Sequence, residues 1–447
     1  MRVYTKTRFT ACLQILFAVF TVFLLSSCGT SYPWGTAVNT GVVTNNPDSI
    51  PNIAWQTQGQ RQELVQQNNI FSSHEEMTQP SVTPALTPAP EAAAPVMPSH
   101  KVAVSLLLPL SGKKADLGQS MLKAAQMALF DIGSANFELI PRDTKSTSEG
   151  AAAAAIESVR THADLILGPI FAEDLKAVKL AVSGSGIPII SFTTDWTLAG
   201  DNTYIMGFLP FIQVARVAKY AQAKGYTRFA VFAPQSEYCD VVIRTLQSSG
   251  VLVVHVNRYA SKQPDLSTLV QDFASTSKSA FSPNQLDFDV LMLPLGSEGL
   301  RTLLTSLDAS GISQPNVRFI GTGLWDDVGL TTNPSLFGGW FAAPDPLLRT
   351  DFERRFQENF GVFPMRLSSL AYDATALAAV LARAAQSATS PYTHEALINP
   401  RGFAGIDGIF RFRPDGLSER GLAVLEIQSG KTVVMDPAPT AFIPPGS

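Results

Sequence analysis

The side chains that could do chemistry in this sequence are mainly hydroxyls and carboxylates in short segments between apolar runs. They are Ser111, Ser191, Thr193, Thr194, Tyr238 and Glu298, with the ring of Phe171 in a comparable place. Hydroxyl groups donate and accept hydrogen bonds, and an ionised carboxylate attracts an ammonium group. This set suits the binding of a small polar ligand.

Motifs of known catalytic centres are lacking from the sequence. The five histidines contain no H-x-x-x-H pair, so we expect no zinc site. Gly430-Lys431-Thr432 imitates the end of a phosphate-binding loop, but Leu425 stands where that motif begins with glycine. No G-x-S-x-G nucleophile elbow occurs either. We therefore expect a protein that is not an enzyme and that needs no metal or cofactor.

The pattern after Lys101 predicts the elements that position these side chains. Short apolar runs alternate with helical periodicity, which is typical of βαβ units and parallel sheets. A first series of strands is expected at 102–108, 137–141, 165–167 and 188–191, with helices at 118–132, 149–162 and 172–183. A second series of strands is expected at 229–233, 251–256, 290–293 and 317–321, with helices at 211–223, 238–248, 266–276 and 299–309. The predicted fold class is α/β, with two doubly wound parallel-sheet lobes and a hinge.

The C-terminal part departs from this alternation. Helices are expected at 351–359 and 367–385, followed by strands at 409–412, 422–427 and 432–435. Turn residues between the last three runs indicate hairpins. We expect the long helix to return to the first lobe and the last strands to lie beside the second lobe or the hinge. The first lobe would then span about 101–208 and the second about 209–340, with a tail at 436–447.

Composition limits the kinds of partner. The chain has 447 residues, with 33 Lys and Arg against 37 Asp and Glu, so the net charge is −4. No basic run is present, so nucleic acid is not an expected partner. With 45% hydrophobic and only 16% charged residues, the sequence can form a large core.

The first residues are typical of an export signal. Arg2, Lys6 and Arg8 precede an apolar run that ends near Leu25 and is too short to span a bilayer. The following Ser26-Ser27-Cys28-Gly29 resembles the bacterial lipobox, in which the cysteine is lipidated and becomes the new N-terminus. Residues 1–27 are thus predicted to be a lipoprotein signal peptide and Cys28 the lipid attachment site. The alternative is a cleaved soluble protein in which Cys28 has no special role.

A segment rich in proline and glutamine separates Cys28 from the predicted lobes. Residues 28–100 show no hydrophobic periodicity, so we expect a disordered tether. The tether would let a lipid-anchored, periplasmic domain work well away from its membrane. In lipoproteins an acidic residue after the lipidated cysteine favours the inner membrane, and Gly29 stands there instead. We therefore expect the outer membrane rather than the inner one.

Several segments together resemble a known family. The chain carries, in this order, Leu108-Pro109-Leu110-Ser111-Gly112, Ala124-Ala125-Gln126-Met127-Ala128, Leu167-Gly168-Pro169, Ile187-Pro188-Ile189-Ile190-Ser191 and Ala371-Tyr372-Asp373-Ala374. This set is similar to the type I periplasmic binding fold of the leucine/isoleucine/valine-binding proteins, over about residues 101–435. The lipobox, the tether and the sequence from Gly405 to Phe412 make the chain look closest to the branch called penicillin-binding protein activators, lipoproteins held to stimulate peptidoglycan synthases.

The resemblance implies a ligand cleft between the two lobes, and the carboxyl ends of open parallel sheets indicate the same place. Tyr238 matches the tyrosine at a helix start in this family, and Glu298 falls where an acidic residue meets the ligand ammonium. Ser191 is retained. Ala172 replaces a serine that binds the ligand carboxylate, and Asp195 replaces a threonine. The match to an amino-acid pocket is therefore partial.

Each candidate also has a purely structural interpretation. Glu298 suits a helix start whether or not it meets a ligand, and Tyr238 can simply pack. Ser191, Thr193 and Thr194 can satisfy loop backbone groups. Phe171 and Trp325 are commonly packing residues, and Cys239 is expected to be buried and inert.

Two functions remain open. The first is a lipid-anchored activator of a peptidoglycan synthase, which regulates peptidoglycan synthesis. The alternative is the substrate-binding receptor of an ABC transporter, which carries a leucine-like amino acid to a permease by closing its lobes around the ligand.

Overall fold

The computed structural model describes residues 101–133, 136–263, 265–280, 282, 285–385 and 390–442. The predicted signal peptide at 1–27, Cys28 and the tether to residue 100 lie outside the described residues, as does the end of the predicted tail. Within the described ranges, no helix is long and apolar enough to cross a membrane.

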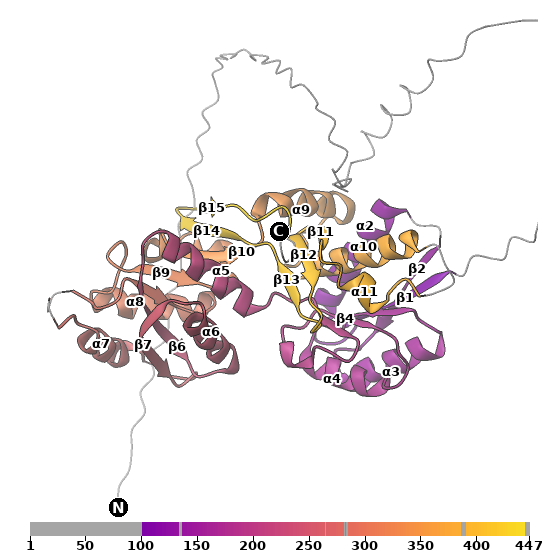
Figure 1. Ribbon diagram of the computed structural model, residues 1–447, viewed down its shortest axis with the longest axis horizontal. Coiled ribbons are helices and arrows are strands. Elements are labelled where there is room, and N and C mark those ends of the chain that lie inside the picture. The colour runs from indigo at the N-terminus through magenta and orange to yellow at the C-terminus, as the bar shows by residue number, and fades with distance from the viewer. Residues whose placement is uncertain are drawn as a thin grey trace, which may run out of the picture. The chain divides into compact units, whose positions relative to one another are not determined.

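The first lobe is built on a five-stranded parallel sheet in the order β2-β1-β3-β4-β5. The strands are β1 (Val102–Leu108), β2 (Phe137–Asp143), β3 (Leu165–Leu167), β4 (Ile189–Ser191) and β5 (Thr203–Ile205). Leu106, Leu107 and Leu108 are fully buried, as expected for a strand that is covered on both faces. Helices α3 (Ser148–Arg160) and α4 (Ala172–Ala181) cover one face, and α2 (Ala115–Ile132) covers the other (Figure 1).

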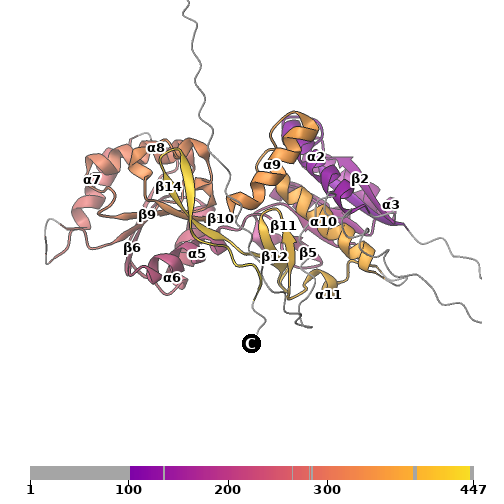
Figure 2. The same ribbon diagram turned by 90° about the horizontal axis from the view of Figure 1, so that it is seen from above.

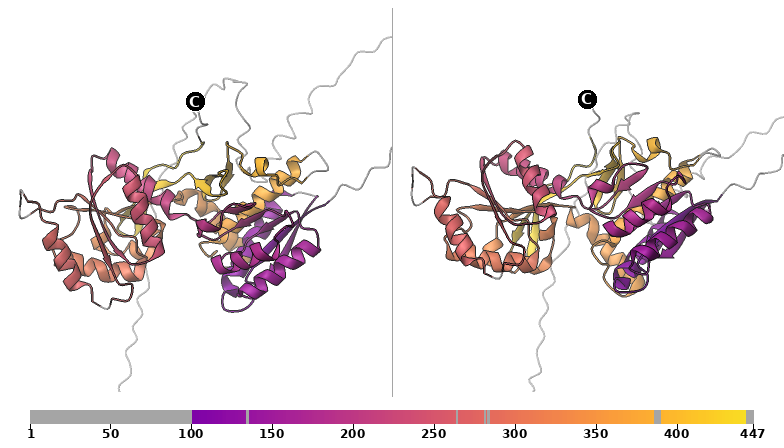
Figure 3. Two further views of the ribbon diagram at one scale, coloured as in Figure 1. Left: turned by 60° about the horizontal axis from the view of Figure 1, so that its bottom comes forward. Right: turned by 90° about the horizontal axis from the view of Figure 1, so that it is seen from below.

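The second lobe contains a seven-stranded sheet in the order β15-β14-β10-β9-β8-β6-β7. Its parallel part consists of β6 (Arg228–Pro234), β7 (Leu252–Tyr259), β8 (Val290–Met292), β9 (Arg318–Gly321) and β10 (Trp340–Ala343). Helices α5 (Pro210–Ala223) and α6 (Glu237–Ser248) pack on one face, and α7 (Ser267–Thr276) and α8 (Ser297–Ala309) pack on the other (Figure 3). The parallel strands confirm the predicted α/β class.

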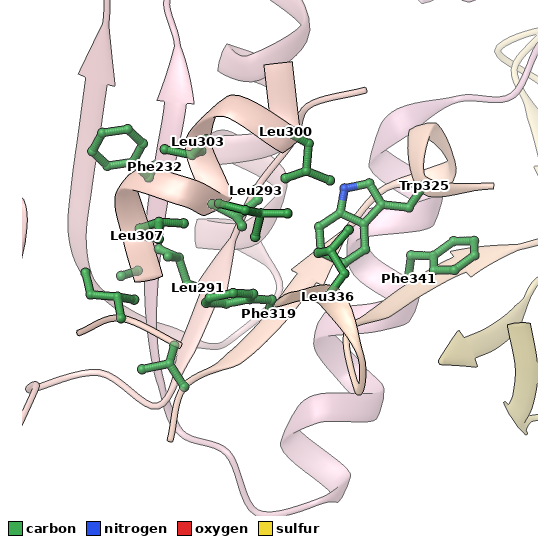
Figure 4. Close-up of a cluster of buried hydrophobic side chains, with 14 of the residues drawn as sticks. Phe232, Leu291, Leu293, Leu300, Leu303, Leu307, Phe319, Trp325, Leu336 and Phe341 are labelled. Atoms are coloured by element: carbon green, nitrogen blue, oxygen red, sulfur yellow. The ribbon is translucent and has the colours of Figure 1, made fainter. Parts of the chain in front are cut away.

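Trp325 lies in the core of the second lobe, as expected for a packing residue. Its side chain is fully buried, and its ring lies 6.4 Å from that of Phe341, among the leucines of α8 and β8 (Figure 4). A side chain on Gly321 would come within 2.2 Å of the indole, so β9 needs glycine at this position. Trp325 is therefore a packing residue of the lobe that carries Tyr238 and Glu298.

The chain returns to the first lobe near its end, as predicted. Helix α9 (Pro346–Phe360) leads from the second sheet to α10 (Ser368–Ala384), and α10 packs along α2 (Figure 2). Alanines dominate both contact faces, and Ala124, Ala128, Ala374 and Ala378 are fully buried. Small side chains let two helix axes approach closely. The expected start of α9 at residue 351 was wrong, because Asp345 caps a helix that begins with Pro346.

The remaining strands form hairpins, and the predicted hairpin of the runs 422–427 and 432–435 is confirmed. The run 409–412 does not pair with 422–427, because a strand at 418–420 lies between them in the chain and pairs with it instead. β14 (Ala423–Gln428) and β15 (Lys431–Asp436) add antiparallel strands to the second sheet beside β10. β11 (Phe403–Gly405), β12 (Gly408–Phe412) and β13 (Ser418–Arg420) make a separate three-stranded sheet, which follows the short helix α11 (His394–Leu397). The sequence prediction missed β5, β10, β11 and β13.

Ion pairs link segments of both lobes at the junction. Asp326, which follows β9 of the second lobe, lies 2.7 Å from the Arg349 guanidinium and 3.1 Å from that of Arg366. Arg366, which precedes α10 of the first lobe, also lies 3.1 Å from the fully buried Asp407. Burial alone would raise the pKa of Asp326, but the two arginines hold it below its usual range.

A second buried carboxylate, Asp373 of α10, lies close to this cluster. Its Oδ1 accepts a hydrogen bond from the backbone N–H of Ile406 at 2.7 Å, whereas Oδ2 has no hydrogen-bond partner and lies 3.9 Å from Arg420. Burial, and then the neighbouring Asp407, raise the pKa of Asp373 to about 7 against the influence of Arg420.

Asp373→Asn should therefore change how stability depends on pH. The pKa of this carboxyl is 3.8 in its ordinary state and about 7 in the folded protein. Its contribution to the stability of the fold is therefore fully present below a pH of about 3.8 and is lost as the pH rises through about 7. The amide cannot ionise, so the melting temperature of the variant relative to the wild type should increase between about pH 5 and about pH 8. Calorimetry measures this difference. Asp272→Asn, at an exposed position, is the control, and a constant difference for Asp373→Asn would contradict the raised pKa.

Candidate functional site

The candidate residues lie at the carboxyl ends of parallel strands or at the helix starts that follow them. Ser111 follows β1, and Ser191 ends β4. Tyr238 stands in the first turn of α6 after β6, and Glu298 in the first turn of α8 after β8. In a parallel sheet these ends share one edge. The candidates thus form two sets, one on each lobe.

Ser111 is exposed and bound to an acid that the sequence prediction did not single out. Its hydroxyl donates to Asp143 Oδ2 at 2.6 Å, and the same carboxylate accepts the backbone N–H groups of Leu110, Ser111 and Lys145. Burial works to raise the pKa of Asp143, but these hydrogen bonds hold it below its usual range. The pair shapes the loop between β1 and α2. The only sequence feature that points to Asp143 as a site residue is its position at the end of β2.

Ser191 and Thr193 are buried and bonded to loop backbone. Ser191 Oγ donates to the Pro169 carbonyl at 2.8 Å and accepts from the Thr193 N–H at 3.3 Å. Thr193 Oγ1 accepts from the N–H of Asp195 at 3.2 Å. The structure thus gives both hydroxyls a structural role within the loop.

Three other first-lobe residues are more accessible. Thr194 is exposed. Phe171 is half-buried and stands at the N-cap position of α4, whose first N–H groups receive no side-chain cap. The Asp195 carboxylate accepts hydrogen bonds from the N–H and the hydroxyl of Thr197, at 3.1 and 2.6 Å. Asp195 therefore caps a short 3₁₀ turn, and its charge is partly satisfied locally.

In the second lobe, Tyr238 is joined to a residue that sequence reasoning missed. Its hydroxyl donates to Thr322 Oγ1 at 2.7 Å, which links α6 to the loop after β9. Thr322 is fully buried and caps the turn Gly323–Trp325. Burial raises the pKa of Tyr238 to about 12, so the phenol is neutral and remains a donor. The position of Thr322 after a strand was the only sequence signal for it.

Glu298 is exposed in the first turn of α8, and no described residue forms a hydrogen bond or an ion pair with its side chain. A carboxylate at this place is favoured by the helix dipole. Gly296 at the N-cap position gives α8 no side-chain cap. Glu298 is therefore the candidate whose charge is available to a ligand.

The two sets are not joined by hydrogen bonds in the described part of the chain. Lys176 of α4 pairs with Glu173 of the same helix, with Nζ 2.7 Å from Oε1, and this contact raises the pKa of the lysine. No group of three or more potential metal ligands occurs in the described ranges, and the side chains named here suit hydrogen bonding and ion pairing.

Cys239, beside Tyr238, is buried as expected, with Sγ 3.8 Å from the Pro294 carbonyl. Burial raises the pKa of its thiol, which disfavours the reactive thiolate.

Solved structures with this fold include several solute receptors. A putative branched-chain amino acid ABC transporter protein from Rhodospirillum rubrum aligns with a TM-score of 0.64 and 18% identity, covering 75% of this chain and 99% of the other. The substrate-binding protein of a branched-chain amino acid transporter from Streptococcus pneumoniae, in complex with isoleucine, has a TM-score of 0.55 and 18% identity, covering 75% and 100%. A solute-binding protein of an ABC transporter from R. palustris, in complex with benzoate, has a TM-score of 0.54 and 16% identity, covering 77% and 98%. At these identities the likeness shows the fold.

Among curated proteins, an uncharacterized protein from Rickettsia prowazekii is 22% identical over 148 residues. That match covers 33% of this chain and only 39% of the relative. A model of the family described as periplasmic binding protein matches residues 101–432, which include every candidate residue named above for ligand binding. The chain therefore belongs to the periplasmic binding protein family.

Proposed function

We propose that the protein is the substrate-binding component of an ABC transporter and that it binds a small carboxylate, with an α-amino acid as the favoured ligand. The observation that carries this proposal is the unpaired Glu298 carboxylate in the first turn of α8, which follows β8 at the same edge of the sheet as the bonded pair Tyr238 and Thr322. A free carboxylate at this edge of the second lobe suits the ammonium group of an amino acid.

The first lobe offers matching chemistry for the ligand carboxylate. Helix α4 begins at Ala172 without a side-chain cap, so its first N–H groups are open to an anion. Phe171 and Thr194 border the same edge. Asp195 would repel a carboxylate if it were free, but its Oδ1 already accepts two hydrogen bonds from Thr197.

The ligands of structural neighbours support a small carboxylate as the class of ligand. Isoleucine and benzoate share a carboxylate, and only isoleucine has an ammonium group as well. In our proposal the ligand is bound between the lobes, and its differential affinity for the closed arrangement shifts the population toward closure. A permease would recognise the closed lobes.

A second candidate function rests on sequence features that lie outside the described residues. Cys28 in a lipobox-like sequence and the proline-rich segment before residue 100 favour a lipid-anchored protein, with the outer membrane preferred because Gly29 follows the cysteine. In this alternative the lobes dock a peptidoglycan synthase, as in the penicillin-binding protein activators, and any ligand regulates that contact.

The first test compares leucine with isocaproate, which has the same skeleton without the amino group. Leucine should raise the melting temperature of the purified protein, because a ligand of the folded state stabilises it by mass action. Glu298→Gln should weaken the binding of leucine at least about tenfold, because an ion pair to the ammonium group is lost. The same variant should leave the affinity for isocaproate unchanged. Glu358→Gln, at an exposed position of α9, is the matched control. A full leucine response in Glu298→Gln would overturn the role of this residue.

The lipid anchor has its own test. Cys28→Ser removes the thiol that would carry the lipid, so the protein should move from the membrane fraction to the soluble periplasmic fraction of the expressing bacterium. Cys239→Ser, at the buried cysteine, should stay with the membranes. Equal distribution of the wild type and Cys28→Ser would argue against lipidation.

The activator function predicts a stable complex with a peptidoglycan synthase. The immobilised full chain should retain the periplasmic part of such a synthase at micromolar concentration, measured by surface plasmon resonance. A chain with both Tyr238→Phe and Glu298→Gln should bind the synthase equally well if the contact surface lies outside the cleft. Absence of retention at this concentration would leave the transporter receptor as the supported function.

A further inference from the structure

The end of the described chain leaves the second lobe and returns to the first. β15 ends at Asp436 in the second sheet, and residues 437–442, which we call the strap, follow it. Phe442 lies against Gly402, directly before β11, because a side chain on this glycine would come within 2.8 Å of the Phe442 ring. The match to the family model ends at residue 432, before the strap begins.

The small sheet of β11, β12 and β13 is attached to the first lobe. Tyr204 of β5 lies against Phe412 of β12, with ring centroids 5.3 Å apart. The N–H of Ile205 donates to the carbonyl of Gly416 at 2.8 Å. Helix α10 of the first lobe also contacts β11 (Figure 2). The strap therefore joins the second sheet to a part of the first lobe.

An arginine of the second lobe fixes the start of the strap. Arg216 of α5 lies 2.7 Å from the Asp436 carboxylate and donates to the carbonyl of Pro437 at 3.3 Å. Its Nε donates to the carbonyl of Leu422 at 2.9 Å. Leu422 lies between β13 and β14, where the chain crosses from the first lobe to the second. One side chain thus binds both the strap and this crossing.

The middle of the strap runs beside the same crossing. A side chain on Gly421 would come within 3.0 Å of the Pro439 carbonyl oxygen, so the two segments are in close contact. The strap begins Pro437-Ala438-Pro439, and the fixed φ of proline makes such a segment stiff. A stiff segment that is attached to both lobes opposes changes in their relative orientation.

The far end of the strap contacts an arginine that is itself fixed. The guanidinium of Arg411 lies 4.4 Å from the centroid of the Phe442 ring. Arg411 Nε donates to Glu419 Oε2 at 2.8 Å, and Nη1 donates to the carbonyl of Pro400 at 3.0 Å. Within the described ranges, no hydrogen bond joins Phe442 to the small sheet. Because the end of the strap is attached only by stacking and packing, it can be released without breaking the sheet.

We propose that the strap is a releasable restraint on the movement of the two lobes. When Phe442 is docked on Arg411, the strap holds the lobes in the arrangement of this structure. When Phe442 is released, the lobes change orientation more freely about the junction. The restraint acts in the absence of a ligand, so it sets the populations from which any ligand between the lobes would select.

Double electron–electron resonance between the lobes tests the restraint without a ligand. Spin labels carried by unnatural amino acids replace Gln126 of α2 and Arg244 of α6, which are both exposed. A chain that ends at Asp436 keeps β15 but lacks the strap, so its distance distribution should be at least about twice as wide as that of the full chain. Phe442→Ala removes the stacked ring and should also broaden the distribution. Phe130→Ala, at an exposed position of α2, is the matched control and should leave the distribution unchanged.

A second variant on the first lobe tests the docking contact. Arg411→Gln should broaden the distribution as Phe442→Ala does, and the double variant should add little, because both changes remove the same contact. A melting curve shows whether the shortened chain is folded, and if it is not, Phe442→Ala carries the test alone. A distribution as narrow as that of the full chain in either Phe442→Ala or the folded shortened chain would overturn the proposal. Equal broadening by Phe130→Ala would overturn it as well.

Discussion

The structure depends on a small group of buried charges where the chain passes between the lobes. Asp407 is fully buried, and the Arg366 guanidinium at 3.1 Å neutralises it. Arg366 also contacts Asp326 of the second lobe, so one arginine serves an acid from each side of the junction. A buried ion pair is strongly destabilised by the loss of one partner, because the other charge is left without water. The junction therefore cannot lose one member of the cluster without a cost to the whole chain.

The two lobes use their polar side chains differently. In the first lobe, Ser111, Ser191 and Thr193 hold loops in shape through hydrogen bonds to Asp143, to a carbonyl and to a backbone N–H. In the second lobe, Glu298 keeps an unpaired carboxylate at a helix start. The hydroxyls of the first lobe thus stabilise its loops, and helix starts without side-chain caps remain open there. The second lobe carries the free carboxylate on which our proposed function rests.

Most of the regular structure could be predicted from local pattern. β1 and β3 have the expected bounds, because continuous apolar runs between turn residues identify buried strands. β5, β11 and β13 are three residues long and carry no recognisable period, and β10 is only four residues long. These strands form because β4, β12 and β9 offer unpaired edges to them. Their existence is a property of the neighbours that they pair with.

The sequence by itself determined the α/β class, the return of α10 to the first lobe and the loops that carry the candidate residues, because apolar periodicity and strand direction are local and additive. Tertiary structure alone decided which hydroxyls are already used, that Tyr238 meets Thr322, and that Arg318 stacks on Trp340. Some of these partners are close in the chain, such as Thr193 and Asp195, but Tyr238 and Thr322 are 84 residues apart. A hydrogen bond depends on distance and direction in space, and the spacing of residues along a chain carries neither.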